Sequence, residues 1–261
     1  MVRHMLYGGH VKTLEHIDFL RDLGFHFGEV VFGNTDSMHS WVDSGTRNRF
    51  DDGFFLIAHG PREGAAKDVN HLWNEYVPQL EQAVRVAHAM EIDFLTVHLW
   101  MDQRFLPPEV IGEKAQMMKR VVSFGRDHGV GVALENLSER AVDLAPILHD
   151  VEDLLITLDI GHGQLLSKKN RAYEILETAA GRVGHVHAHD NRGGNDAAAD
   201  LHLPIGEGIV DFPGVIRCLL DHGYDGTVTI ELPPSEIAAS RDRLAAIAEK
   251  VRAEGSGLAG P

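Results

Sequence analysis

The chain contains a single cysteine, Cys218, so no disulfide can form within it. This cysteine is expected on the apolar side of a helix, where core packing explains it better than nucleophilic chemistry. A lone thiol fits a reducing compartment. The opening residues lack the apolar run of a secretory signal, and no segment is apolar for long enough to cross a bilayer. We therefore expect a cytoplasmic protein with no membrane partner.

Basic residues are also scarce. The 24 lysines and arginines face 39 aspartates and glutamates, which gives a formal net charge of -15. Such an excess opposes broad association with nucleic acids and anionic membranes, and no basic stripe stands out along the chain. A small molecule is therefore favoured as the partner over nucleic acid.

Motifs for covalent and nucleotide chemistry are missing as well. The sequence contains no G-x-S-x-G element, no Walker loop and no G-x-G-x-x-G after a predicted strand. We therefore expect no nucleotide cofactor, and covalent catalysis ranks low.

Short apolar and β-branched runs alternate with longer segments of helical period, a pattern typical of parallel βα units. Eight strand candidates begin near Val2, Glu29, Phe54, Asp93, Gly131, Leu154, Gly184 and Thr227. A length of 261 residues suits one large barrel. The sequence therefore predicts the α/β class, with a single (β/α)8 TIM barrel over residues 1–253 and a flexible tail over residues 254–261.

Six of the predicted strands end in a residue that can bind metal. These residues are His59, His98, Glu135, Asp159, His187 and Glu231. Three further candidates, His162, Asp200 and His202, lie just beyond strand ends. A parallel barrel directs its active site to the carboxyl ends of its strands. Carboxylates that converge there resist ionisation unless cations or protons compensate them, and metal is the simplest compensation.

Each histidine also has a structural interpretation. A single strand-end histidine such as His59 or His98 is more often a buried, hydrogen-bonded residue than a metal ligand. His189 shares a strand face with His187, so His187 alone or both could bind metal. His185 would lie one layer deeper and is expected to fill the barrel.

Two long polar segments are expected to cover the active face. Residues 34–53, after the second strand, show no clear helical stripe and are predicted to form a loop that brings Trp41 or an arginine to the substrate. Residues 191–208, after the seventh strand, are rich in glycine and must deliver Asp200 and His202.

Taken together, these residues resemble the xylose isomerase-like barrels, which include sugar isomerases and epimerases, inosose-processing enzymes and the endonuclease IV group. The resemblance spans about residues 59–231. It rests on L-E-N, L-D-I-G-H, H-V-H-A-H-D, D-L-H-L-P-I-G-E-G-I-V-D-F and I-E-L. In the epimerase branch it implies that one divalent ion (zinc, manganese, magnesium or cobalt) is held by Glu135, Asp159, His187 and Glu231. It also implies that His162 contacts the substrate.

Adding His59, His98, Asp200 and His202 completes the pattern that holds three zinc ions in the endonuclease branch. The chain departs from that branch at D-I-G-H, where the branch has D-T-C-H, and at His189-Asp190, where it has Asn-Asp. One divalent ion with three carboxylates leaves one net negative charge, which suits a neutral polyol. Three ions with four carboxylates leave two positive charges, which suit a phosphate.

The sequence therefore predicts a metal-dependent isomerase or epimerase of a sugar, sugar phosphate or polyol. Glu135 and Glu231 would exchange the proton next to a carbonyl through an enediolate that the metal stabilises. The substrate contacts would be His162, Arg192, His98 and Trp41. The alternative is an endonuclease IV-like trinuclear zinc phosphodiesterase acting on abasic-site DNA, and a non-catalytic binding barrel ranks third. The particular sugar, the number of metal ions, the native metal and the oligomeric state stay open, and the family is compatible with oligomers.

Overall fold

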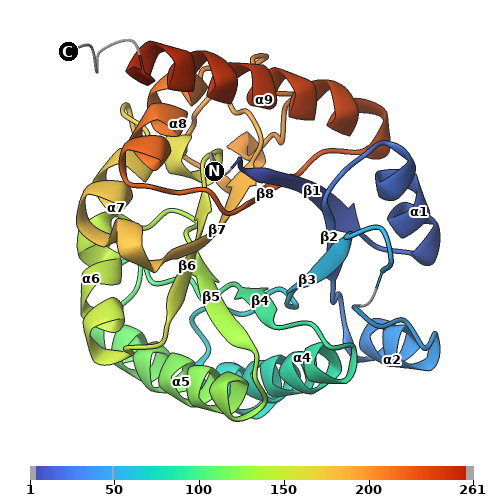
Figure 1. Cartoon of the computed structure of the whole chain (residues 1–261). Helices are drawn as coiled ribbons and strands as arrows, with labels where there is room; N and C mark the ends of the chain where they lie inside the picture. The colour runs from blue at the N-terminus through green and yellow to red at the C-terminus, as the bar shows by residue number, and fades with distance from the viewer. Residues whose placement is uncertain (1–3, 49, 257–261) are drawn as a thin grey trace.

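The computed structural model describes residues 4–48 and 50–256. Eight parallel strands close into a barrel in chain order, and the last strand pairs with the first (Figure 1). The strands are β1 (Leu6–Val11), β2 (Phe27–Val31), β3 (Phe55–His59), β4 (Phe94–Val97), β5 (Gly131–Glu135), β6 (Leu155–Asp159), β7 (Val183–Ala188) and β8 (Thr227–Ile230). The predicted (β/α)8 barrel is confirmed.

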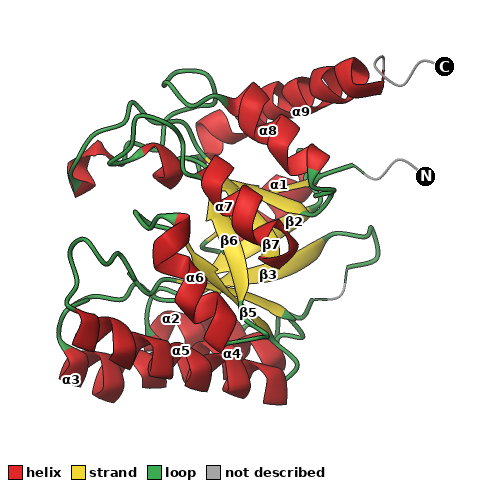
Figure 2. Ribbon diagram, turned by 90° about the vertical axis from the view of Figure 1, so that its left-hand side faces the viewer, coloured by secondary structure: helices red, strands yellow, loops and turns green. Residues whose placement is uncertain are grey.

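Helices surround the strands, and long loops gather at one end of the barrel (Figure 2). The main helices are α1 (Leu14–Asp22), α2 (Thr35–Asp43), α4 (Val77–Ala89), α5 (Pro108–Asp127), α6 (Ala141–Asp150), α7 (Ala172–Ala179), α8 (Phe212–Asp221) and α9 (Pro234–Ser256). Short helical turns are α3 (Val69–His71), η1 (Leu72–Tyr76), η2 (His162–Gln164), η3 (Ala180–Arg182) and η4 (Ala197–Ala199). Among the described residues, no helix combines the length and apolar character of a membrane span.

The interior of the barrel below the strand ends contains satisfied polar groups as well as apolar ones. His185 on β7 contacts the hydroxyls of Thr227 and Thr229 at 2.7 and 3.0 Å, and the rings of Phe27 and Phe94 approach it edge-on. His185 therefore fills the barrel as predicted. Each of its ring nitrogens has a partner, so this buried histidine needs no ligand to explain it.

The polar segment after β2 differs from its prediction. Residues 35–43 form helix α2, because Asn34 and Ser37 form a capping box at its start. Met38 and Trp41, one turn apart, then pack into the hydrophobic core, and Trp41 is only 5% exposed. The expectation that Trp41 reaches the substrate from a loop was wrong.

Two predictions concern the ends of the chain. The predicted strand start at Val2 lies outside the described residues, and β1 begins at Leu6. Residues 254–256, expected to open a flexible tail, form the end of α9. Residues 257–261 lie outside the described part.

A buried ion pair fixes the loops that follow β3 and β4. Lys114 on α5 is fully buried, and its ammonium donates to Glu63 and to the Trp100 carbonyl oxygen, the latter at 2.8 Å. The Glu63 carboxylate also accepts from the Trp100 backbone N–H at 3.0 Å. These loops begin at His59 and His98. The ion pair therefore helps to fix the positions of two predicted site residues relative to each other.

We predict that Lys114→Met lowers the free energy of unfolding by about 3–5 kcal/mol, because it leaves the Glu63 carboxylate buried without its partner. The double variant Lys114→Met/Glu63→Gln should recover much of the loss. Urea unfolding measures both values. The control, Arg126→Gln, removes an ion pair to Asp153 in which both side chains are more than half exposed, and should cost less than about 1 kcal/mol. A Lys114→Met effect as small as that of the control would contradict the prediction.

Candidate metal centre

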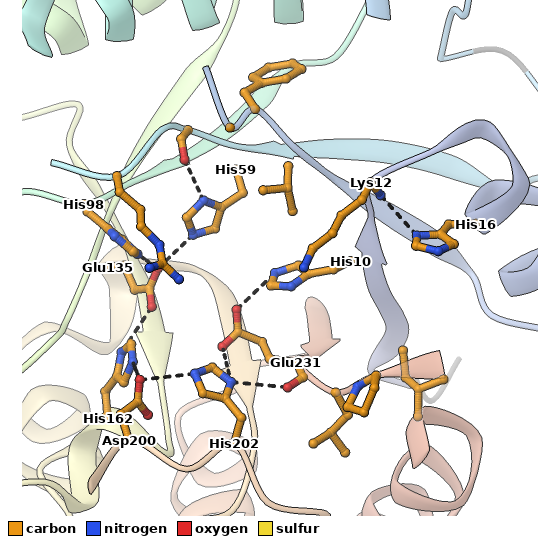
Figure 3. Close-up of a pocket in the computed structure, with 18 of the residues that line it drawn as sticks. His10, Lys12, His16, His59, His98, Glu135, His162, Asp200, His202 and Glu231 are labelled. Carbon is orange, nitrogen blue, oxygen red and sulfur yellow. Dashed lines mark hydrogen bonds and ion pairs between the residues drawn. The ribbon is translucent and has the colours of Figure 1, made fainter. Parts of the chain in front are cut away.

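A cavity of about 1110 Å³ opens at the carboxyl ends of the strands. Residues from all parts of the chain line it, and Figure 3 shows them pointing toward a common space. The predicted site residues among them are His59, His98, Glu135, His162, Asp200, His202 and Glu231. Asp159 and His187 are fully buried and contact these residues. The structure therefore brings all nine predicted ligand candidates together.

The centre of the cluster is the Nδ1 atom of His187. It lies 3.5 Å from Glu135 Oε1, 3.9 Å from Asp159 Oδ2 and 3.3 Å from Glu231 Oε1. Metal bonds of 2.0–2.2 Å place the donors of a tetrahedral shell about 3.3–3.6 Å apart. The three distances from His187 Nδ1 are thus close to those between the ligands of a metal ion, and the ligand atoms of Asp159, His187 and Glu231 all lie within 4.8 Å of one another.

Two of the four donors lack a hydrogen-bond partner. His187 Nδ1 and Asp159 Oδ2 are buried and unsatisfied. A buried polar atom without a partner costs about 1–3 kcal/mol, so such atoms call for an explanation. Carboxylate oxygens and imidazole nitrogens are ligands that divalent ions such as zinc accept. The four residues fit a divalent ion.

Glu135 also contacts histidines on its other side. Its Oε2 atom lies 3.1 Å from His59 Nε2 and 2.8 Å from His98 Nε2, as Figure 3 shows. The second ring nitrogen of His59 lies 2.9 Å from the Gly60 carbonyl oxygen, which fixes the ring. His59 and Glu135 also form a possible donor group with His187, so this second group shares Glu135 and His187 with the first.

A third group of donors comes from η2, from His189 directly after β7, and from the long loop that follows. Asp200 Oδ2 lies 3.3 Å from His162 Nε2 and 3.2 Å from His202 Nε2. His189 Nε2 and Asp200 Oδ1 are 3.9 Å apart, and neither has a hydrogen-bond partner. His189 Nε2 also lies 3.2 Å from Asp159 Oδ1 and 3.9 Å from Glu231 Oε2. His189 therefore lies between the third group and the first, whereas His187 faces the first.

The loop that carries Asp200 and His202 is held by Asp190, the last residue of H-A-H-D. Its backbone pairs with Leu203, and its carboxylate accepts from the backbone N–H groups of Gly206 and Val210 at 2.8 and 3.1 Å. His202 has a φ of 44°, a left-handed conformation that is strained for a side-chain-bearing residue. The loop thus folds over the site as predicted, and Asp190 anchors it.

The buried carboxylates and histidines of the cluster shift each other's pKa values. Burial alone would raise the pKa of Glu135, but His98 and His187 outweigh it and hold the pKa well below its ordinary value. The pKa of Glu231 is likewise held low against burial by His187 and His10. Burial opposes charge on His187 too, yet Glu29 and Glu231 raise its pKa well above the ordinary value. The buried carboxylates and histidines therefore stabilise each other's charged forms.

Two residues of the cluster were not predicted from the sequence. They are His10 on β1 and Glu29 on β2. Their Cα atoms are register neighbours. His10 Nε2 lies 3.0 Å from Glu231 Oε1, and Figure 3 shows the two side chains pointing at each other. Glu29 contacts His187. The strand was predicted to begin near Glu29, so Glu29 was not considered as a site residue. It lies in the middle of β2, F-G-E-V-V, and a charged residue inside an apolar strand is itself a sign of a functional or paired group.

The predicted substrate contacts are placed differently. His98 and His162 line the cavity. Arg192 is exposed on its loop and does not line it, so the structure does not support the expected contact. Two other cations, Lys12 and Arg62, do line the cavity, and Lys12 extends toward His10 in Figure 3.

Comparison with known proteins shows the family and the fold of the chain. The family model described as xylose isomerase-like TIM barrel matches residues 17–253. The uncharacterized protein MJ1311 of Methanocaldococcus jannaschii is 30% identical over 197 residues, which cover 67% of this chain and 64% of that protein. Fructoselysine 3-epimerase of Shigella flexneri is 23% identical over 172 residues, which cover 62% of this chain and 60% of the enzyme. The chain thus spans less than two thirds of the length of these relatives.

A solved structure extends the likeness to nearly the whole chain. The crystal structure of a D-tagatose 3-epimerase-like protein has a TM-score of 0.79 and 23% identity, and the match covers 96% of this chain and 99% of that protein. At this level of identity the likeness shows the fold.

We predict that, in the presence of a chelator, the free energy of unfolding falls as the pH rises from about 6.5 through about 9. Burial lowers the pKa of His202, but its hydrogen bond to Asp200 and the charge of Glu231 outweigh burial and raise the pKa from 6.5 to about 9. The stabilisation is complete below the unfolded pKa and is lost as the pH rises through the folded pKa. Urea unfolding at several pH values measures the trend.

The matched variant for this prediction is His202→Gln, which removes the titrating ring. Its unfolding free energy should fall less steeply between the same pH values. An unchanged slope in this variant would contradict the role given to His202.

Proposed function

The chain belongs to the family of xylose isomerase-like TIM barrels, and on this premise we propose that it is a divalent-metal-dependent isomerase or epimerase of a sugar, sugar phosphate or polyol. The observation that carries the proposal is the convergence of three carboxylates on His187 Nδ1 at 3.3–3.9 Å, beside an open cavity. The resemblance to proteins named as 3-epimerases supports it.

Glu135, Asp159, His187 and Glu231 would hold the ion. The chemistry that a divalent ion supplies when bound in such a site is polarisation of a carbonyl oxygen, which makes the neighbouring C–H bond more acidic. Asp159 is suited to binding alone, because its carboxylate is fully buried and also accepts from the His162 backbone N–H at 2.7 Å.

Glu135 and Glu231 are the proposed proton carriers. They reach the cavity from β5 and from the end of β8, three strands apart around the barrel. Both have pKa values held well below the ordinary value, so each is ionised and able to accept a proton. One carboxylate would remove the proton from one face of the substrate. The other, after taking up a proton from solvent, would deliver it to the opposite face, and the first would then release its proton to solvent.

His162 and His98 are placed to bind substrate oxygens. Both line the cavity, and both contact Glu135, with His162 Nδ1 at 3.1 Å and His98 Nε2 at 2.8 Å. A substrate hydroxyl next to the reacting carbon would therefore meet an imidazole and a proton carrier together. This arrangement aligns the C–H bond with the base, a requirement for fast proton transfer.

A second function is favoured by the completeness of the donor set. Beyond the first four residues, the donors of the three-zinc pattern are all gathered in the site: His59, His98, His162, Asp200 and His202. A trinuclear zinc site would suit attack on a phosphodiester, with abasic-site DNA as the substrate. The net charge of -15 opposes DNA binding, so this function stands second.

We predict that Glu135→Gln and Glu231→Gln each slow proton exchange by a factor of about 10²–10⁴, the usual contribution of a positioned acid or base. The measurement is the loss of the proton next to the carbonyl, followed by NMR in D2O with a panel of ketoses, ketose phosphates and keto-polyols. Glu174→Gln is the control, because Glu174 lies on α7 and accepts from the Ala141 backbone N–H outside the site. Full exchange by both site variants with metal still bound would refute the mechanism.

A separate assay tests the second function. Under the first proposal, the protein does not cut duplex DNA that contains an abasic site. Incision of that DNA, abolished by His59→Ala, would place the phosphodiesterase first.

A further inference from the structure

Glu29 is a buried acid that the proposed chemistry does not use. It lies in the middle of β2, its side chain is fully buried, and it does not line the cavity. Both of its oxygens lie 3.1 Å from His187 Nε2. His185 Nε2 and His10 Nε2 follow at 3.5 and 3.8 Å. Among the described residues, no lysine or arginine is paired with it.

The two ring nitrogens of His187 have different surroundings. Nε2 faces the Glu29 carboxylate, which can only accept, so Nε2 carries the proton and donates it. Nδ1 has no hydrogen-bond partner and faces the oxygens of Glu135, Asp159 and Glu231. Glu29 therefore selects the tautomer in which the Nδ1 lone pair points at the proposed metal position.

The cost of burying a carboxylate stabilises the contact between Glu29 and His187. A carboxylate removed from water costs several kcal/mol unless hydrogen bonds and opposite charge compensate it. Within residues 4–48 and 50–256, the charged partners of Glu29 are the histidines His10, His185 and His187. If the His187 ring turned away, Glu29 would lose its two shortest contacts inside the barrel, so the ring and the acid hold each other in place.

We propose that Glu29 is a positioning residue, which orients His187 so that its Nδ1 atom can bind the divalent ion. The inference rests on the metal site proposed above. In metal sites generally, a partner that accepts from the second nitrogen of a histidine ligand contributes a factor of about 10–100 in metal affinity.

The first test compares the zinc affinity of three forms of the full-length chain by competition with a chromophoric chelator. Glu29→Ala removes the acceptor and should weaken zinc binding about 10–100-fold. Glu29→Gln keeps an amide oxygen that can accept from His187 Nε2, so it should retain most of the affinity. Asp143→Asn is the control, because this buried carboxylate caps α6 through Arg140, away from the donor cluster.

Wild-type affinity in Glu29→Ala would overturn the inference, as would equal losses in the Gln and Ala variants. Absence of zinc binding by the wild-type chain would overturn the proposed metal site as well, so the two failures are distinguishable. Neither readout requires the substrate to be known.

A second measurement needs no variant and therefore does not depend on the variants folding. Nitrogen-15 NMR of the zinc-loaded wild-type chain, with His187 assigned, reports which ring nitrogen carries a proton. The inference expects a proton on Nε2 and none on Nδ1. A proton on Nδ1 would overturn it.

Discussion

The carboxylates of Glu29, Glu135, Asp159 and Glu231 are crowded at or just below the carboxyl ends of the strands, and each is more than nine-tenths buried. Among the described residues no lysine or arginine is paired with any of the four, and histidines surround them instead. Like charges at this spacing repel strongly in a poorly hydrated interior. The histidines must therefore carry protons, or a cation must be bound.

The rest of the fold keeps this crowded set in place. The barrel gathers the residues at six strand ends in one cluster, and the Lys114–Glu63 pair fixes the loops that start at His59 and His98. Asp190 anchors the loop that closes over the site with His202. The geometry of the candidate site is thus supported by buried polar contacts at two places around the rim, as positioned sites generally require.

Much of the site could be predicted because ligand placement follows strand direction. Glu135 and Asp159 each end an apolar run, and a parallel barrel sends every such end to the same face. Glu29 was missed because it lies within its strand, where its burial depends on His187, 158 residues away along the chain. Trp41 was misplaced because its contacts with the core, which are tertiary, decide its burial, and a local pattern does not show them.

The metal content of the untagged chain, purified without chelator and measured by elemental mass spectrometry, tests the central claim most directly. We expect close to one divalent ion per chain, and its loss when Asp159 is replaced by asparagine. A metal-free chain that still turns over a sugar would contradict the metal centre. Close to three zinc ions per chain would contradict the mononuclear isomerase and favour the phosphodiesterase.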